Sequence, residues 1–217
     1  MSATTFRDHA EAHGAVHHAG VHLRRSRSEP ALALMTERRN ISPRRLVEPG
    51  PSREEVGTLM EAAVTAPDHG TLTPWRFILI PDAARPGLGH AFAKALVERD
   101  PGATQEQLET AVEKAHRAPC LLVAVLRRDN GTSGIPDAER LVSLGCAIQN
   151  ALLAATAMGY GSGLTSGRSL SSTAMRSYLG LQPDEQAVCF LAVGTKSVIK
   201  AARVRPLAET VLHTLTA

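Results

Sequence analysis

A chain of 217 residues with 43% hydrophobic residues is long enough to bury a substantial core, and it fits one domain with appendages. Its 24 Lys and Arg residues exceed its 21 Asp and Glu residues by a net charge of only +3, which argues against nucleic acid as a partner. Apolar runs such as Leu121 to Leu126 and Ala151 to Met158 fall far short of the roughly 20 residues of a membrane span, so we expect a soluble protein.

Residues 1–29 differ from the rest of the chain, because they are rich in His and Arg and poor in large apolar side chains. We predict a flexible arm over residues 1–29, followed by one domain over residues 30–217. His9, His13 and His17 could hold a metal, but no carboxylate or thiol completes a site, so a solvated tail is the favoured interpretation and no metal is expected.

The first half of the domain combines helical patterns with one strand pattern. Pro30 suits a first helical turn, and Ser52-Arg53-Glu54-Glu55 is a capping box that begins a second helix, which Pro67 ends. Trp75 to Pro81 is typical of a covered strand. Two further helices are predicted over Ala83 to Asp100 and Glu106 to Arg117, the second being either a mobile cover over a site or a plain surface helix.

The second half begins with continuous apolar sequence from Pro119 to Leu126, which predicts a central strand. Asp137 to Met158 is the longest helical pattern, with Leu141, Leu144, Ile148 and Leu152 on one stripe. Because this helix is so apolar, we expect it either at the centre of the domain or at a subunit interface.

The remaining segments are shorter. Gly159 to Gly167 is a glycine-rich bend after a helix, most often only a tight connection, and it lacks the dinucleotide-binding fingerprint. A short helix is predicted from Ser171 to Leu179, and Ala187 to Val193 is a further apolar strand. The last amphipathic segment, Leu207 to Leu215, would need a partner surface to cover it.

Three cysteines, Cys120, Cys146 and Cys189, are widely spaced and lie in apolar segments. An odd number leaves one cysteine over after pairing, and metal sites usually have closer spacing. We therefore expect buried free thiols in a reducing compartment, which indicates the cytoplasm.

Two polar stretches flank the helix that begins at the capping box. Arg38-Arg39-Asn40 offers guanidinium groups that match a phosphate or planar anion, and an amide that can donate to a carbonyl or ring nitrogen. Ala66 to Phe77 holds helix breakers, short polar side chains and the only tryptophan, as expected of a binding loop. Other interpretations stay open, because an Arg pair at a helix end is commonly solvated and His69 could simply cap the helix.

In this order, the two stretches together with Gly159 to Gly167 and Leu191 to Thr195 resemble the FMN-dependent nitroreductase family, in particular its short YdjA-like branch. The resemblance runs from about Ala31 to the last residues. It implies an α+β fold with three α/β/α layers around a central mixed, mainly antiparallel sheet. It also implies a homodimer.

The resemblance further implies FMN bound in a cleft at the dimer interface. NADH or NADPH would deliver hydride to the flavin and leave, after which a nitroaromatic, a quinone or a similar acceptor would take two electrons in a ping-pong reaction without a catalytic base. By motif position, Arg38, Arg39 and Asn40 would hold the phosphate and the pyrimidine edge of the ring, Thr65 and His69 would approach from the partner chain, and Leu164, Thr165 and Ser166 would flank the ring.

The chain departs from the family pattern at three places. Asn40 stands where Ser is usual, Thr73 where Gln often precedes Pro-Trp, and Leu164-Thr165 where the branch can carry Trp-Arg. Without that Arg, flavin affinity would fall by about 1 to 3 kcal/mol unless Arg168 or Arg76 compensates. Further basic residues suit the phosphate equally well, with no basis for choosing among them: Lys196, Lys200, Arg203 and Arg205.

Two other functions stay open beside the oxidoreductase. The chain could hold flavin without turnover, or it could be an α/β interaction protein without flavin whose basic arm recruits a partner. A yellow protein that does not oxidise nicotinamide would indicate the first, and a protein that stays colourless after incubation with FMN would indicate the second.

Overall fold

The computed structural model describes residues 28–199, 201 and 203–216, and it divides at Arg38 into two units. In the first unit residues 28–37 are helical, and the apolar side chains of Leu32 and Met35 are 59% and 50% exposed. The predicted N-terminal arm and its histidines lie almost wholly outside the described residues. The second unit, residues 39–217, contains the sheet.

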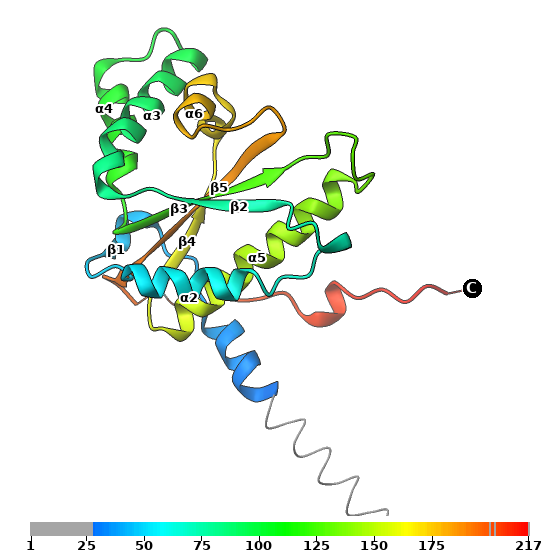
Figure 1. Ribbon diagram of the computed structural model, residues 1–217. Coiled ribbons are helices and arrows are strands. Elements are labelled where there is room, and N and C mark those ends of the chain that lie inside the picture. Colours follow the sequence, from blue (N-terminus) through cyan, green and yellow to red (C-terminus); the bar gives the residue numbers. More distant parts are fainter. Residues whose placement is uncertain (1–27, 200, 202, 217) are drawn as a thin grey trace, which may run out of the picture. The chain divides into compact units, whose positions relative to one another are not determined.

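The sheet is built around its longest strand, β5 (Glu185–Lys196). Strand β3 (Cys120–Arg127) pairs with one edge of β5, and β4 (Gly161–Thr165) pairs with the other. Strand β2 (Trp75–Leu79) extends the sheet beyond β3, and β1 (Leu46–Val47) pairs with the end of β5 (Figure 1). All four pairings are antiparallel, and an isolated parallel bridge between Asn40 and Ser162 makes the sheet mixed.

Strand β3 shows why the chain folds into layers. Its first seven residues are all buried, and successive side chains of a strand point to opposite faces. Leu121, Val123 and Val125 enter one apolar cluster, while Leu122 and Ala124 enter another. A strand that is apolar on both faces needs helices on both sides, as the sequence predicted.

Those helices form the two outer layers (Figure 1). Helices α2 (Arg53–Ala63) and α5 (Asp137–Ala157) cover one face of the sheet. The other face is covered by α3 (Arg85–Arg99), α4 (Gln105–Glu113) and α6 (Thr173–Tyr178). The predicted α+β, three-layer fold with a mixed, mainly antiparallel sheet is confirmed. Short 3-10 turns join the elements at Pro43–Arg45, His69–Thr71, Asp82–Ala84, Lys114–His116, Arg168–Ser171 and Ala208–Thr210.

Local signals in the sequence set most element boundaries. The capping box at Ser52 and Glu55 is present, with the Ser52 hydroxyl accepting from the Glu55 amide. A second capping box, Thr104 with Gln107, begins α4 and was missed by the sequence analysis. The predicted helix over residues 106–117 is therefore shorter, because α4 ends at Glu113 and a 3-10 turn follows.

Helix α5 corrects one part of the sequence analysis. Leu144, Ile148 and Leu152 are buried, at 0%, 7% and 4% exposure, but Leu141 is 48% exposed and Val142 is 67% exposed. The predicted stripe was wrong at Leu141, which lies on the outer side of the helix. Among the described residues, α5 is the one helix long and apolar enough to cross a membrane, yet half of that stretch is buried inside this chain.

The glycine-rich segment is a strand, not the bend that the sequence suggested. Residues Gly161 to Thr165 pair with Gly194 to Phe190 in regular antiparallel register. Glycines lower the intrinsic preference for a strand, so periodicity gave no signal here. The long apolar edge of β5 supplies the pairing partner that overrides that preference.

Two further features were predicted only in part. Cys120 and Cys189 are buried free thiols, but Cys146 is only half-buried. Burial raises the pKa of Cys120 and Cys189 to about 11, so both stay protonated. Near the C-terminus, Leu207, Val211, Leu212 and Leu215 are 64% to 97% exposed, so this chain does not cover them.

Candidate functional site

The first of the two predicted polar stretches lies against β4. The Ile41 amide donates to the Ser162 carbonyl at 2.9 Å, and the Leu164 amide donates to the Asn40 side-chain oxygen at 2.9 Å. Asn40 is therefore a brace for β4, a role that the sequence analysis did not foresee. These bonds bring Asn40 and Leu164, two predicted site residues far apart in sequence, into direct contact.

Gly163 permits this close approach. A Cβ atom at Gly163 would lie 2.0 Å from the Ile41 carbonyl oxygen and 3.3 Å from the Asn40 side-chain oxygen. No side chain could occupy that space without moving the backbone of residues 40–41. The glycine thus explains why a sequence with weak strand preference is found at this position.

Two hollows flank the turn that follows Ile41. One, of about 420 Å³, is lined by Ile41, Ser42, Arg44, Arg45 and Val198. The other, of about 370 Å³, lies on the α3 and α4 side of the sheet and is named here the basic pocket. Its cations are Arg44, Lys114 and Arg117, its floor includes Leu121 and Phe190, and Thr165 lies at the end of β4. Both volumes fall in the range of small-molecule sites.

The basic pocket concentrates positive charge. Partial desolvation, and next the cations of Arg117, Arg99 and Arg44, lower the pKa of Lys114. Desolvation and Arg44 likewise lower the pKa of Arg117, against a smaller opposing effect of Glu113. No ion pair in the described part of the chain involves Arg44, Lys114 or Arg117. Clustered cations of this kind favour a bound anion.

The second predicted stretch forms a separate group at the end of α2. The Asn150 amide donates to the Thr65 hydroxyl at 3.0 Å, and His69 Nδ1 lies 2.8 Å from a carboxylate oxygen of Glu139. Asp68 accepts from the Thr73 amide at 2.5 Å and closes the loop. The side chains of Thr65 and His69 thus bond to α5, whereas Asn40 bonds to Leu164 on β4. The structure thus places the predicted site residues in two groups.

One residue of this loop, Trp75, has a structural role, although the sequence pattern could suggest a functional one. Trp75 is only 6% exposed, and its indole N–H donates to the Ser143 hydroxyl of α5 at 2.9 Å. The tryptophan therefore fastens β2 to α5 in the core. The polar side chains near Trp75, rather than its buried indole ring, are accessible to a ligand.

Arg76 does not supply the missing flavin cation. Its guanidinium donates to both carboxylate oxygens of Glu185, at 2.6 and 2.8 Å, and Glu185 is 4% exposed. This hydrogen bonding, with the Gln182 amide and the charges of Arg76 and Arg127 assisting, lowers the pKa of Glu185. Positive charge beside Thr165 comes instead from the basic pocket.

The other predicted cations are less well placed by the structure. Arg38 ends the helix of the first unit, where its amide donates to the Leu34 carbonyl at 3.0 Å. Lys196 is the last residue of β5. Arg168, Arg203 and Arg205 are exposed, and Lys200 lies outside the described residues. Their roles toward a phosphate stay predictions, as do those of Arg39, Thr165 and Ser166.

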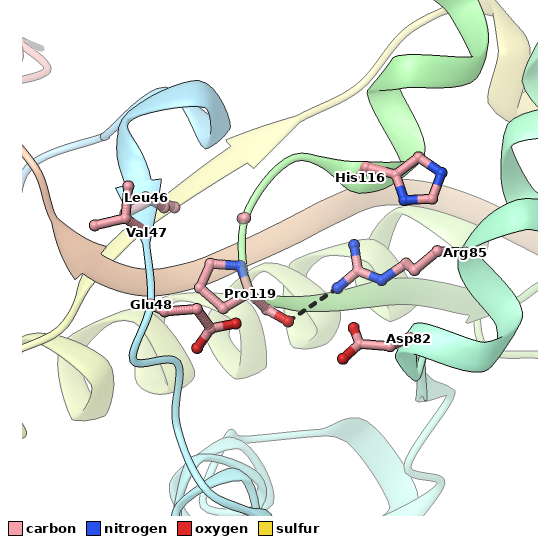
Figure 2. A pocket seen from close by; sticks show the side chains of 8 residues that line it. Leu46, Val47, Glu48, Asp82, Arg85, His116 and Pro119 are labelled. Carbon is pink, nitrogen blue, oxygen red and sulfur yellow. Dashed lines mark hydrogen bonds between the residues drawn. The ribbon is translucent and has the colours of Figure 1, made fainter.

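A third pocket, of about 340 Å³, has a structural arginine at its centre (Figure 2). Buried Arg85 donates to the carbonyls of Ile80, Ala115 and Pro119 at 3.2, 2.8 and 3.0 Å. It thereby ties the start of α3 to the segment before β3. Glu48, Asp82 and His116 also line this pocket, but within the described ranges no group of three His, Cys, Asp or Glu side chains is arranged to hold a metal.

The sequence analysis missed Lys114 and Arg117 as site residues. They fall in the helix predicted over Glu106 to Arg117, which was interpreted either as a mobile cover over a site or as a surface helix, because nothing in the local pattern places them beside β4. The signal that could have found them is their position directly before the buried strand β3, whose residue Leu121 forms the pocket floor.

The chain was compared with known proteins. Residues 35–195 match the family model described as the nitroreductase family. A Haemophilus influenzae protein, provisionally named an NAD(P)H nitroreductase, is 34% identical over 165 residues, covering 76% of this chain and 88% of that protein. YdjA of Escherichia coli K12, named in the same way, is 32% identical over 168 residues, covering 76% of this chain and 87% of that protein.

A solved structure leads to the same family. A Desulfovibrio desulfuricans protein, provisionally named a nitroreductase, was crystallised in complex with FMN. It is 25% identical to this chain, with a TM-score of 0.64 over 87% of this chain and 98% of that one. The similarity to YdjA agrees with the branch that the motifs indicated. Because the family model spans most of the sequence and the three-layer fold agrees with it, the chain belongs to the nitroreductase family.

Proposed function

We propose that this protein is an FMN-dependent oxidoreductase that passes two electrons from NADH or NADPH to a small acceptor such as a nitroaromatic or a quinone. Donor and acceptor use one site in turn, in a ping-pong reaction. The observation that carries the proposal is the contact of Asn40 and Ile41 with β4, beside two ligand-sized hollows lined with cations. The relatives named as NAD(P)H nitroreductases and the FMN complex support it.

The residues around the two hollows fit FMN chemically. A flavin mononucleotide needs cations for its phosphate, an apolar surface for its ring, and hydrogen bonds for the polar edge of that ring. Arg44 and Arg45 supply charge, Ile41 and Val198 supply apolar surface, and Ser42 supplies a polar group. Arg38 and Arg39 directly precede this segment and would hold the phosphate.

When bound, FMN supplies the two-electron chemistry. The protein supplies position and charge, and no side chain is assigned as a general acid or base. Asn40 holds the end of β4 in place, and Leu164, Thr165 and Ser166 would flank the flavin ring. The Asn40 brace therefore acts on orientation rather than on proton transfer.

The second group of site residues completes the site from a partner subunit in this proposal. Thr65 and His69 are exposed, and each is oriented by a side chain of α5, Asn150 and Glu139 respectively. In a homodimer they would face the flavin that the partner's Arg38, Arg39 and Asn40 equivalents hold. We place the dimer in the cytoplasm, where the protonated thiols of Cys120 and Cys189 stay reduced.

The absorption spectrum of the purified protein tests the proposal. We expect a yellow protein with a flavin spectrum that oxidises NADPH or NADH only when an acceptor such as menadione or 4-nitrobenzamide is supplied. A protein that holds flavin but oxidises neither nucleotide is instead a flavin carrier. A protein that stays colourless after incubation with FMN contradicts the proposal altogether.

A variant links the spectrum to the residues. Arg39→Ala removes a proposed phosphate partner, so we expect FMN affinity to fall about tenfold or more, consistent with losing one charged hydrogen bond. Affinity for riboflavin, which has no phosphate, should stay unchanged. Lys94→Ala on the outer side of α3 is the control for loss of one surface cation, and it should leave both affinities unchanged.

A further inference from the structure

The basic pocket has a composition that the proposed cofactor does not account for. It combines three cations, Arg44, Lys114 and Arg117, with a floor of Leu121 and Phe190, which are 4% and 5% exposed. A phosphate alone needs no apolar floor, and a neutral ring needs no cations. The combination suits an aromatic or similarly apolar molecule that carries a negative group.

The pocket is also next to the predicted flavin edge. Thr165 pairs with Phe190 across β4 and β5, and both line the pocket. In the proposed function Thr165 flanks the ring, so a molecule in this pocket would lie beside the site of electron transfer. Ser42 and Arg44 line both this pocket and the hollow of about 420 Å³, which is left for the cofactor.

We propose that the basic pocket selects electron acceptors that carry a carboxylate or another anionic group on an aromatic ring. This inference rests on the proposed function and names its substrate class. Lys114 and Arg117, from the turn after α4, bind the anionic group, while Leu121 and Phe190 contact the ring. Lys114 and Arg117 act in binding and are not assigned to the chemistry.

The size of the pocket favours an acceptor over the dinucleotide donor. About 370 Å³ holds one substituted ring and its acid group. The 2′-phosphate that distinguishes NADPH from NADH lies at the far end of the dinucleotide from the reacting nicotinamide. A donor phosphate would therefore lie away from the flavin edge, whereas the pocket adjoins it.

The reaction with such an acceptor balances without further reagents. A nitroarene carboxylate receives the equivalent of one hydride, which carries two electrons, from NADPH, and one proton from solvent. It leaves as the nitroso compound and water, and NADPH becomes NADP⁺. The carboxylate is unchanged and serves only for recognition.

The test compares two acceptors that differ in one charge, 4-nitrobenzoate and 4-nitrobenzamide, on the flavin-loaded protein. We expect kcat/KM to favour 4-nitrobenzoate, and the preference to weaken as salt is raised. In the variant Lys114→Gln/Arg117→Gln, the preference should fall about tenfold or more, since each pocket cation contributes attraction at reduced dielectric. The loss of rate with 4-nitrobenzoate should exceed any change with 4-nitrobenzamide, and the double variant should still bind FMN. Lys94→Gln, which removes a cation outside the pocket, should keep the preference.

A binding measurement separates this inference from the proposed function. Calorimetric titration with benzoate, which cannot be reduced, should show binding to the wild-type protein and about tenfold weaker binding to the double variant. A protein that binds benzoate through these residues but holds no flavin would contradict the proposed function while keeping the anion pocket.

Three outcomes would overturn the inference. The first is an unchanged preference and unchanged benzoate affinity in the double variant. The second is that the double variant no longer binds FMN but still binds riboflavin, which would assign the pocket to the cofactor phosphate. The third is a changed ratio of NADPH to NADH with no change between the two acceptors, which would assign it to the donor.

Discussion

At Gly163 the backbone of residues 40–41 passes so close to β4 that one atom decides whether the site can form. The Ile41 carbonyl oxygen would lie 2.0 Å from an added Cβ, well inside contact distance. Gly167, four residues further on, has no neighbouring atom within 4 Å of such a Cβ, and its φ of 165° is extended backbone that any residue adopts. The two glycines thus form a matched pair within one segment.

We expect Gly163→Ala to lower the free energy of unfolding by about 2 kcal/mol, because the clash is with backbone and cannot be relieved by a rotamer change. It should also reduce FMN retention, since the Asn40 brace on Leu164 must shift. Gly167→Ala should be neutral or slightly stabilising. Urea unfolding and flavin absorbance of the two variants measure both effects, and equal behaviour of the two would refute the assignment of Gly163.

Residue-level features also mark the limit of sequence reasoning. The motif order grouped Asn40 with Leu164, and the structure brings the two into contact, but the motifs could not show that Asn40 braces β4, because that bond joins residues 124 positions apart. Arg76 could not be excluded as a flavin cation before its partner Glu185 was known. Such pairings depend on strand register, which the local pattern does not encode.

At the scale of elements, apolar patterns predicted β3 and α5 well, and the capping box at Ser52 predicted the start of α2, because each satisfies a local rule. Strand β4 was missed because its glycines give no periodic signal and its pairing with β5 is a tertiary effect. The outer position of Leu141 was missed because a helical stripe does not reveal which side faces the sheet. Long-range packing decided each of these cases.

The pair Arg76 and Glu185 shows how elements are joined at the sheet. Arg76 on β2 and Glu185 at the start of β5 meet across β3, and Arg127 of β3 lies 3.9 Å from the same carboxylate. The hydrogen bonds of Arg76 depress the pKa of Glu185 below the value of about 4.3 that an unfolded Glu has. The stability from this ionised group is fully present above the unfolded pKa and is lost as pH falls through the folded pKa.

We therefore expect Glu185→Gln to destabilise the protein at pH 7 by about 3 kcal/mol, because it leaves a partly buried guanidinium without its counter-charge. The loss should shrink as pH drops below about 4, where the wild-type carboxylate also becomes protonated. Urea unfolding from pH 7 to pH 3 measures this, with Glu106→Gln on the exposed side of α4 as the control. A constant difference in the free energy of unfolding between variant and wild type from pH 7 to pH 3 would contradict the assigned pKa shift.

For the whole molecule, the exposed apolar surface is the feature that a single chain does not explain. Val142 on α5 is 67% exposed, and Val211, Leu212 and Leu215 near the C-terminus are 72%, 74% and 97% exposed. Exposed apolar patches of this kind indicate a protein interface. A symmetric dimer would bury them and could bring Thr65 and His69 of one chain to the Arg38 to Asn40 segment of the other.

The structure also changes how dimerisation should be tested. The helical stripe first suggested Leu144 and Ile148 as positions for a charge that would disrupt a dimer. Both lie in the chain's own core, so a charge there would unfold the monomer. Val142→Glu instead places the charge on the exposed side of α5, where the monomer can tolerate it. Val97→Glu on α3, a position 44% exposed on the opposite face of the sheet, is the matched control.

We predict that Val142→Glu halves the mass measured by light scattering and removes bound FMN, while far-UV circular dichroism stays unchanged. Val97→Glu should leave both mass and flavin content as in the wild type. Because the two groups of site residues belong to different chains in this arrangement, Arg38→Ala and His69→Ala variants that bind flavin poorly alone should regain flavin when mixed, up to one site per dimer. A wild-type monomer that carries flavin would contradict this arrangement, since all the residues of the site would then have to come from one chain.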